Sequence, residues 1–169
     1  QLELARYFDE YELLTPQNAK RVYDSTSAQV STENFSAQKL LTRMKVEVLC
    51  TTEDPTDTLE HHQSLAASDF AIKVSTAFRP DKSVLIDQPA YNAYIDRLGE
   101  VAGIDIATYD DLCLALTKRL DFFHENGCRL SDHGLNTIPY QETDAARLSK
   151  IFAKRRSGAA VSADESAQF

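Results

Sequence analysis

The sequence predicts an α/β chain in which short parallel strands alternate with helices, preceded by a segment that is helical throughout. Two observations support this fold class. Short apolar runs recur between longer amphipathic segments, which is the pattern of βα units. A polar loop also follows each short run, as expected where the strands of a parallel sheet end.

The first third of the chain predicts helices only. Their ranges are 2–11, 15–27 and 36–44. Thr15 and Pro16 favour a helix start, because Thr caps a helix and Pro is tolerated in its first turn. We therefore predict a helical segment at residues 1–45, followed by the βα units at residues 46–169.

The first two strands flank a predicted helix. Residues 46–51 are mostly apolar and β-branched, which suits a strand buried on both faces. Asp54 as a cap and Pro55 in the first turn predict that a helix starts there and runs to about residue 68. The second strand is predicted at residues 71–76, directly before the stretch AFRPDK at 77–82.

The second half of the chain adds one short strand at 128–131 among longer helices. The helices are predicted at 89–101, 108–126 and 143–157. One face of the second of these helices carries Leu112, Leu116, Leu120 and Phe123. Gly127 is expected to end that helix as a left-handed cap.

The chain is expected to be a piece of a larger α/β protein. Three parallel strands can neither close a barrel nor form a fully covered sheet. Gln1 lies inside a helical pattern without an initiator Met, and Ser162 with Glu165 forms a capping box that opens a further helix.

Composition narrows the class of protein. The net charge of -8 disfavours nucleic acid and anionic membranes as partners. No apolar run is long enough to span a bilayer, so a soluble, cytoplasmic protein is predicted. Cys50, Cys113 and Cys128 are odd in number and lack CxxC spacing, so we expect buried free thiols rather than a disulfide or a zinc site.

The loops that follow parallel strands meet at one edge of a sheet, so TTEDP, AFRPDK and SDHGL are expected to share that edge. Arg79 could present its planar guanidinium to a carboxylate or to hydroxyl groups. The alternative is that Arg79, Asp81 and Lys82 form a solvated turn. Thr52 could line a sugar site, and so could Asp54, although helix capping already accounts for Asp54.

Asp132 and His133 stand before Gly134 at the end of the third strand. An imidazole and a carboxylate can exchange protons or bind sugar hydroxyls. The alternative is a histidine satisfied by a neighbouring backbone group. His61 and His62 are adjacent, so they diverge on a helix and are expected to be structural or exposed.

Several segments together resemble the uronate isomerases, the glucuronate and galacturonate isomerases among the amidohydrolase-like, metal-dependent (β/α)8 barrels. The resemblance rests on CTTEDPTDTLEHH, AFRPDK and CRLSDHG in this order and spacing. The segments LELARYF, ENFSAQKLLTRMKVEVLCTTEDP and LTKRLDFFHENGCRLSDHG extend it to essentially the whole chain.

This resemblance implies a partial (β/α)8 barrel, in which the predicted strands are the second, third and fourth and residues 1–45 are a helical insertion after the first strand. It implies an enzyme that interconverts a hexuronate aldose and its ketose, with Arg79 and Thr52 binding the substrate and with His133 and Asp132 in catalytic roles. The family's divalent metal, expected to be zinc, is held by a His-x-His pair and an Asp that are outside this chain. No metal site is therefore expected here, and the chain alone is expected to be inactive.

Two other functions stay open from the sequence. The chain could be a non-catalytic binding or assembly module whose exposed sheet edges pair with another copy, so that the fragment self-associates. It could also belong to a related barrel with hydrolase chemistry, because the ligands that distinguish such enzymes lie outside the chain.

Overall fold

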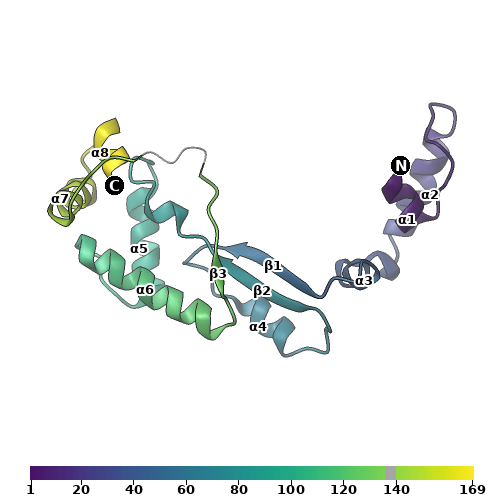
Figure 1. The fold of residues 1–169 in the computed structure, drawn as a ribbon, viewed down its shortest axis with the longest axis horizontal. Helices are drawn as coiled ribbons and strands as arrows, with labels where there is room; N and C mark the ends of the chain where they lie inside the picture. The colour runs from purple at the N-terminus through teal and green to yellow at the C-terminus, as the bar shows by residue number, and fades with distance from the viewer. Residues whose placement is uncertain (136–139) are drawn as a thin grey trace. The chain divides into compact units, whose positions relative to one another are not determined.

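The computed structural model describes residues 1–135 and 140–169 (Figure 1). The helices are α1 Leu2–Phe8, α2 Ala19–Val30, α3 Ala37–Arg43, α4 Glu60–Ala66, α5 Tyr91–Ala102, α6 Tyr109–Glu125, α7 Ala145–Arg156 and α8 Ala163–Gln168. The strands are β1 Val48–Glu53, β2 Lys73–Phe78 and β3 Leu130–Ser131, and short 3-10 helices occur at Glu33–Phe35 and Asp81–Ser83. The chain separates into two compact units, one formed by Gln1–Val48 with Phe70–Lys73 and the other by Leu49–Asp69 with Val74–Phe169.

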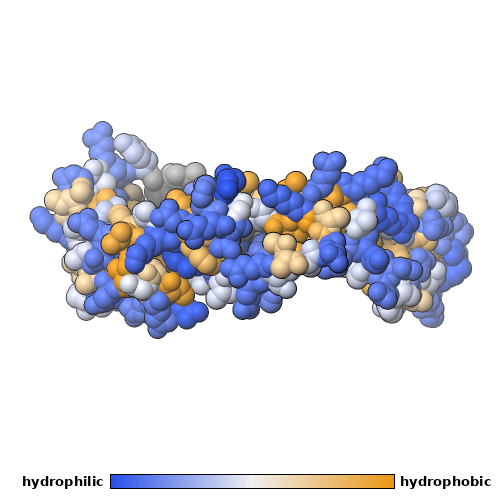
Figure 2. All heavy atoms as spheres, turned by 90° about the horizontal axis from the view of Figure 1, so that it is seen from below, coloured by the Kyte–Doolittle hydropathy of each residue, from blue (hydrophilic) through white to orange (hydrophobic). Residues whose placement is uncertain are grey.

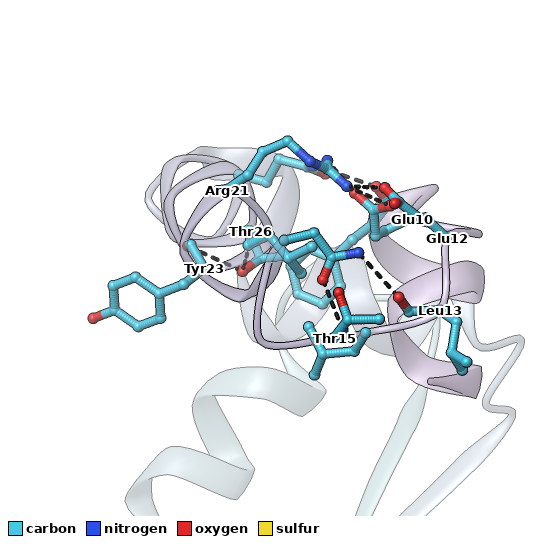
Figure 3. Close-up of polar contacts among 12 residues, drawn as sticks. Glu10, Glu12, Leu13, Thr15, Arg21, Tyr23 and Thr26 are labelled. Carbon is cyan, nitrogen blue, oxygen red and sulfur yellow. Dashed lines mark hydrogen bonds and ion pairs between the residues drawn. The ribbon is translucent and has the colours of Figure 1, made fainter.

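In the first unit, polar side chains tie α1 to the helices that follow it. Arg43 donates to the carbonyl oxygens of Tyr7 and Arg6, at 2.7 and 2.8 Å, and so satisfies acceptors at the end of α1. Arg21 of α2 pairs with Glu10 at 2.7 Å and with Glu12 at 2.6 Å (Figure 3). These contacts lie at the surface, so packing of the apolar faces has to supply most of the stability of this unit.

The second helix starts at Ala19 rather than at Thr15, where it was predicted. The Asn18 side chain accepts a hydrogen bond from the Thr15 amide at 2.8 Å and donates one to the Leu13 carbonyl at 3.0 Å (Figure 3). These two bonds close a turn that includes Pro16 ahead of the helix. The predicted third helix is confirmed, with Ser36 as its cap.

The predicted parallel sheet is confirmed, in the strand order β1-β2-β3. Strands β2 and β3 are parallel, with Ala77 opposite Leu130 and Phe78 opposite Ser131. The Arg79 amide donates to the Glu53 carbonyl at 3.0 Å, at the carboxyl ends of β2 and β1. Both β1 and β2 are shifted by two residues from their predicted ranges, since they begin at Val48 and Lys73 rather than at residues 46 and 71. Strand β2 therefore ends at Phe78 and includes the first two residues of AFRPDK.

The prediction that the first strand is buried on both faces is wrong. Burial along β1 alternates between exposed and half-buried residues, and Val48 is 59% exposed. Strand β1 is an edge strand of the sheet, and successive side chains point to opposite faces, so one face of it is open. Figure 2 shows apolar patches, in orange, among hydrophilic atoms on one face of the molecule.

The helix predicted to start at Asp54 and Pro55 starts only at Glu60. The Asp54 side chain accepts hydrogen bonds from the amide and hydroxyl of Thr56, at 2.9 and 2.8 Å. The Asp57 carboxylate accepts the Asp54 amide at 2.7 Å. Asp54 therefore closes a turn instead of capping a helix, because local side-chain bonds compete with the helical backbone.

The main core of the second unit lies among α5, α6, α7 and the loops that join them. Its buried side chains are Ile86, Tyr91, Ile95, Leu98, Ile106, Leu112, Ala115, Ile151 and Phe152. A second cluster joins Phe78 of β2 to Phe123 of α6, edge to face, with ring centroids 5.1 Å apart. This contact fixes α6 against the strand that leads to Arg79.

The buried face of α6 differs from the predicted one. Leu112 and Phe123 are buried as predicted and Leu116 is half-buried, but Leu120 is 47% exposed and Arg119 is buried in its place. The face that points inward follows the 3.6-residue period through Arg119, and hydropathy alone could not identify a buried cation.

All three cysteines are free, but only Cys128 is buried. Cys50 and Cys113 are exposed, which corrects the predicted burial.

Within residues 1–135 and 140–169, no helix combines the length and apolar character that a membrane crossing requires.

The start of α6 is set by a capping box, which supports a stability prediction. Thr108 accepts from the Asp111 amide at 3.2 Å, and Asp111 accepts the Thr108 amide at 2.8 Å. Thr108→Ala is expected to lower the free energy of unfolding by about 1 kcal/mol, measured by urea denaturation. Thr117→Ala, at an exposed position inside the same helix, is the control, with an expected change below about 0.5 kcal/mol. Equal losses in the two variants would contradict the capping role.

Candidate functional site

Polar side chains from the ends of all three strands meet at the carboxyl edge of the sheet. Arg79, directly after β2, donates from Nε to Oδ1 of Asp132 at 3.1 Å and from Nη2 to Oδ2 of the same carboxylate. Thr52 of β1 donates from Oγ1 to Oδ2 of Asp132 at 3.3 Å. The sequence predicted that these loops share one edge. The structure adds that side chains from the three loops bond to one another directly.

The ion pair of Arg79 and Asp132 compensates both charges. Its two side chains are 37% and 38% exposed, so the pair borders solvent. The hydrogen bond from Arg79 is the main cause that lowers the pKa of Asp132, and the same bond raises the pKa of Arg79. In residues 1–135 and 140–169, Nη1 of Arg79 has no hydrogen-bond partner, so this group can donate to a ligand.

His133 is held by Asp81, a residue to which the sequence analysis assigned no functional role. Nδ1 of His133 lies 2.6 Å from Oδ1 of Asp81, and Oδ2 of Asp81 accepts the Gly134 amide at 2.6 Å. The Asp81 side chain is 12% exposed, whereas that of His133 is 54% exposed. A carboxylate at Nδ1 stabilises the tautomer with hydrogen on Nδ1, which leaves Nε2 as an acceptor.

Gly134 lies close to two of these side chains. A Cβ at this position would lie 3.2 Å from Nη1 of Arg79 and 3.5 Å from Oδ2 of Asp81. A larger residue at the end of the motif SDHG would therefore require the end of the Arg79 side chain to shift slightly.

A pocket of about 410 Å³ opens beside the ion pair. It is lined by Thr52, Glu53, Asp54, Asp57, Arg79, Asp81 and Lys82. Nζ of Lys82 lies 3.2 Å from Oδ2 of Asp54, which joins the loop after β2 to the loop after β1. Asp54 was expected to be explained by helix capping, but it does not cap a helix and it lines this pocket.

The alternative of a solvated turn does not describe AFRPDK. Arg79 pairs with Asp132, Asp81 with His133, and Lys82 with Asp54, so each charge has a partner from another segment. One feature of the sequence indicates this arrangement, namely three charged residues close together at the end of a strand. Such charges require partners if the loops of neighbouring strands meet there.

His61 and His62 lie on α4. Nε2 of His62 is 2.7 Å from Oγ1 of Thr51, in a neighbouring pocket that shares Glu53 and Asp57 with the first, and His61 is exposed, as expected. No group of three or more His, Cys, Asp or Glu side chains in the described part of the chain could hold a metal ion.

The charge state of Asp132 provides a test of the pair. Arg79→Gln is expected to raise the pKa of Asp132 toward its ordinary value of 3.8, because it removes the main cause of the lowering. In the native chain, the contribution of the pair to stability is complete above pH 3.8 and is lost as the pH falls through the lowered pKa. Titration of the carboxyl carbon by NMR measures the shift, and Arg97→Gln on α5 is the control. A pKa unchanged by Arg79→Gln would contradict the pairing.

Comparison with known proteins identifies the family. The chain matches the family described as glucuronate isomerase over residues 1–169. It is 46% identical over 168 residues to a uronate isomerase of Flavobacterium johnsoniae, covering 99% of this chain and 36% of that protein. It is 45% identical over 154 residues to one of Caldanaerobacter subterraneus subsp. tengcongensis, covering 90% of this chain and 33% of the relative.

Solved structures agree with these relatives. The uronate isomerase of Thermotoga maritima matches with a TM-score of 0.90 and 32% identity, covering 98% of this chain and 36% of that one. The glucuronate isomerase of Caulobacter crescentus matches with a TM-score of 0.88 and 27% identity, covering 99% of this chain and 35% of that one. The chain thus spans about a third of the length of the proteins it matches, and it belongs to the glucuronate isomerase family.

Proposed function

We propose that the chain is part of a cytoplasmic uronate isomerase, which interconverts D-glucuronate and D-fructuronate, or D-galacturonate and D-tagaturonate. The observation that carries the proposal is the family match along residues 1–169, together with the polar groups gathered at the carboxyl edge of the sheet. In the longer protein, β1, β2 and β3 would be the second, third and fourth strands of a (β/α)8 barrel. Residues 1–45 would be a helical insertion after the first strand.

The reaction class defines what this edge has to do. An aldose becomes a ketose when a proton leaves the carbon beside the carbonyl and an enediol forms, after which a proton returns to the neighbouring carbon. The substrate has to be held by its hydroxyl and carboxylate groups while protons move. The residues of this chain would contribute binding groups and one group able to exchange protons.

Arg79 and Thr52 would bind the substrate, with Asp132 between them. The charge of Arg79 is already compensated by Asp132, so a substrate carboxylate would have to compete with that carboxylate. A sugar hydroxyl would not compete, because it can accept from Nη1 of Arg79 and donate to Asp132 at the same time. We therefore favour the hydroxyl groups of the uronate as the ligands of this pair.

His133 would act as the group that exchanges protons. With hydrogen held on Nδ1 by Asp81, Nε2 can take a proton from a substrate hydroxyl and later return it. Asp132, as the neighbouring carboxylate, would accept a hydrogen bond from an adjacent hydroxyl of the substrate and so hold the substrate in place during the transfer.

The family resemblance implies a divalent metal, with zinc as the expected ion. Within the ranges that the structure describes, the acidic, histidine and cysteine side chains do not form a set that fits one. Residues outside this chain would therefore hold the metal, and no step assigned to this chain passes through it.

Substitution of Arg79 tests the proposal in the full-length protein. Arg79→Lys keeps the positive charge but cannot form both bonds to Asp132 and still donate to the substrate. Loss of one charge-assisted hydrogen bond predicts that kcat/KM for the preferred uronate falls by about 10-fold to 100-fold. The assay follows aldose-to-ketose conversion, and Arg97→Lys on the surface of α5 is the matched control. Unchanged kinetics in Arg79→Lys would overturn the assignment.

A further inference from the structure

The most unusual side chain of the second unit is a buried arginine in the middle of α6. Arg119 is 8% exposed and lies on the same helix face as Leu112 and Phe123. Burial lowers its pKa, and the charge of Asp57 acts against that effect. In residues 1–135 and 140–169 its guanidinium forms no ion pair, so its charge is stabilised by other groups.

Those groups are backbone carbonyls and an aromatic face. Nε of Arg119 donates to the Pro55 carbonyl at 2.7 Å, Nη2 to the Asp57 carbonyl at 2.8 Å, and Nη1 to the Val101 carbonyl at 3.5 Å. The guanidinium carbon lies 4.1 Å from the centre of the Phe122 ring, a cation–π contact. Three carbonyl dipoles and an aromatic face offset part of the desolvation cost of the buried charge.

Packing alone does not explain this residue. A leucine or methionine would fill the same position on α6 without the cost of burying a charge. A planar guanidinium has several donors in a fixed arrangement, which suits two carbonyls two residues apart in a loop. The residue type therefore matches the attachment of the loop after β1 to α6.

That loop forms one wall of the candidate pocket. Asp54 and Asp57, on either side of Pro55, line the pocket beside Arg79 and Lys82. The loop is closed internally by the bonds of Asp54 to Thr56 and Asp57. The place of the loop relative to Arg79 therefore depends on what attaches it to the rest of the fold.

Attachments fix the loop on two further sides. Lys82 holds Asp54 from the loop after β2, and Leu59 is buried against Phe78 and Phe123 at the end of the loop. Leu59 has a φ of 58°, in the left-handed region that is unfavourable for a branched residue. Arg119 of α6 attaches the loop between Asp54 and Leu59. The acceptors on the loop are the backbone carbonyls of Pro55 and Asp57.

We propose that Arg119 is a positioning residue of the candidate site, which holds the loop 54–59 so that its acidic wall faces the substrate beside Arg79. The role in catalysis rests on the proposed isomerase function, whereas the attachment of the loop does not. Arg119 is not among the residues that line the pocket, so its effect reaches the site through the loop that it holds at Pro55 and Asp57.

Two substitutions and a control test this role in the full-length protein. Arg119→Met keeps the length and packing of the side chain but removes every donor. Arg119→Lys keeps the charge and can bind one carbonyl instead of two. Lys118→Met is the matched control, because Lys118 is the exposed neighbour on α6 and donates only to the Ala102 carbonyl at 3.3 Å.

The first measurement is hydrogen exchange of the loop, followed by mass spectrometry. The amides of Asp54 and Thr56 bond to Asp57 and Asp54 side chains within the loop, so they report whether it stays closed. Exchange in the peptide covering 54–59 is expected to be at least about tenfold faster in Arg119→Met, less so in Arg119→Lys, and unchanged in Lys118→Met. A folded Arg119→Met protein with native exchange in this peptide would overturn the proposal. If Arg119→Met does not fold, Arg119→Lys decides by the same criterion.

The second measurement separates binding from chemistry. KM for the uronate is expected to rise about tenfold in Arg119→Met with a smaller change in kcat, because the wall of the pocket is displaced while the reacting groups stay. Faster exchange of the loop with unchanged KM would overturn the positioning role. If the native protein converts no uronate at all, the proposed isomerase function fails, and the exchange measurement still decides whether Arg119 holds the loop.

Discussion

The register of β2 against β3 is the constraint on which the candidate site depends. Ala77 lies opposite Leu130 and Phe78 opposite Ser131, so the next residues of the two strands, Arg79 and Asp132, leave the sheet side by side. A slip of one residue would turn one of the two side chains to the other face. The contact of Phe78 with Phe123 of α6 supports this register, because it requires the same face of β2 to be buried.

Charges around the pocket are compensated in pairs that each join two loops. Arg79 with Asp132 joins the loops after β2 and β3, and so does Asp81 with His133. Lys82 with Asp54 joins the loops after β2 and β1. The loop after β2 is therefore the common partner. A ligand that enters this edge meets cations that are already paired, together with further carboxylates from Glu53 and Asp57. Such a surface suits the hydroxyl groups of a sugar better than it suits an isolated anion.

Helix α6 serves both the core and the pocket. Its start is set by the capping box of Thr108 and Asp111, and Leu112 packs in the main core. One turn from Phe123, the same face carries Arg119, which holds the loop after β1. A single helix can do both because its buried face runs past the core to the edge of the sheet, where backbone carbonyls replace apolar side chains as partners.

The sequence alone determined the features that depend on neighbouring residues. The helix start at Thr108, the capping box at Ser162, the end of α6 before Gly127 and the alternation of strands and helices were all predicted, because caps and periodicity are local. Thr52, Arg79, Asp132 and His133 were selected because loops after parallel strands meet at one edge.

Only the tertiary structure decided which of these side chains pair and which residues hold them. The burial of Arg119, the ion pair of Asp54 with Lys82 and the contact of His133 with Asp81 all depend on residues far apart in the sequence. Hydropathy treats an arginine as exposed, and helix signals treat Asp54 as a cap. Neither takes account of a partner that the fold brings from another segment, and that partner decides the outcome because a buried charge or polar group must be satisfied.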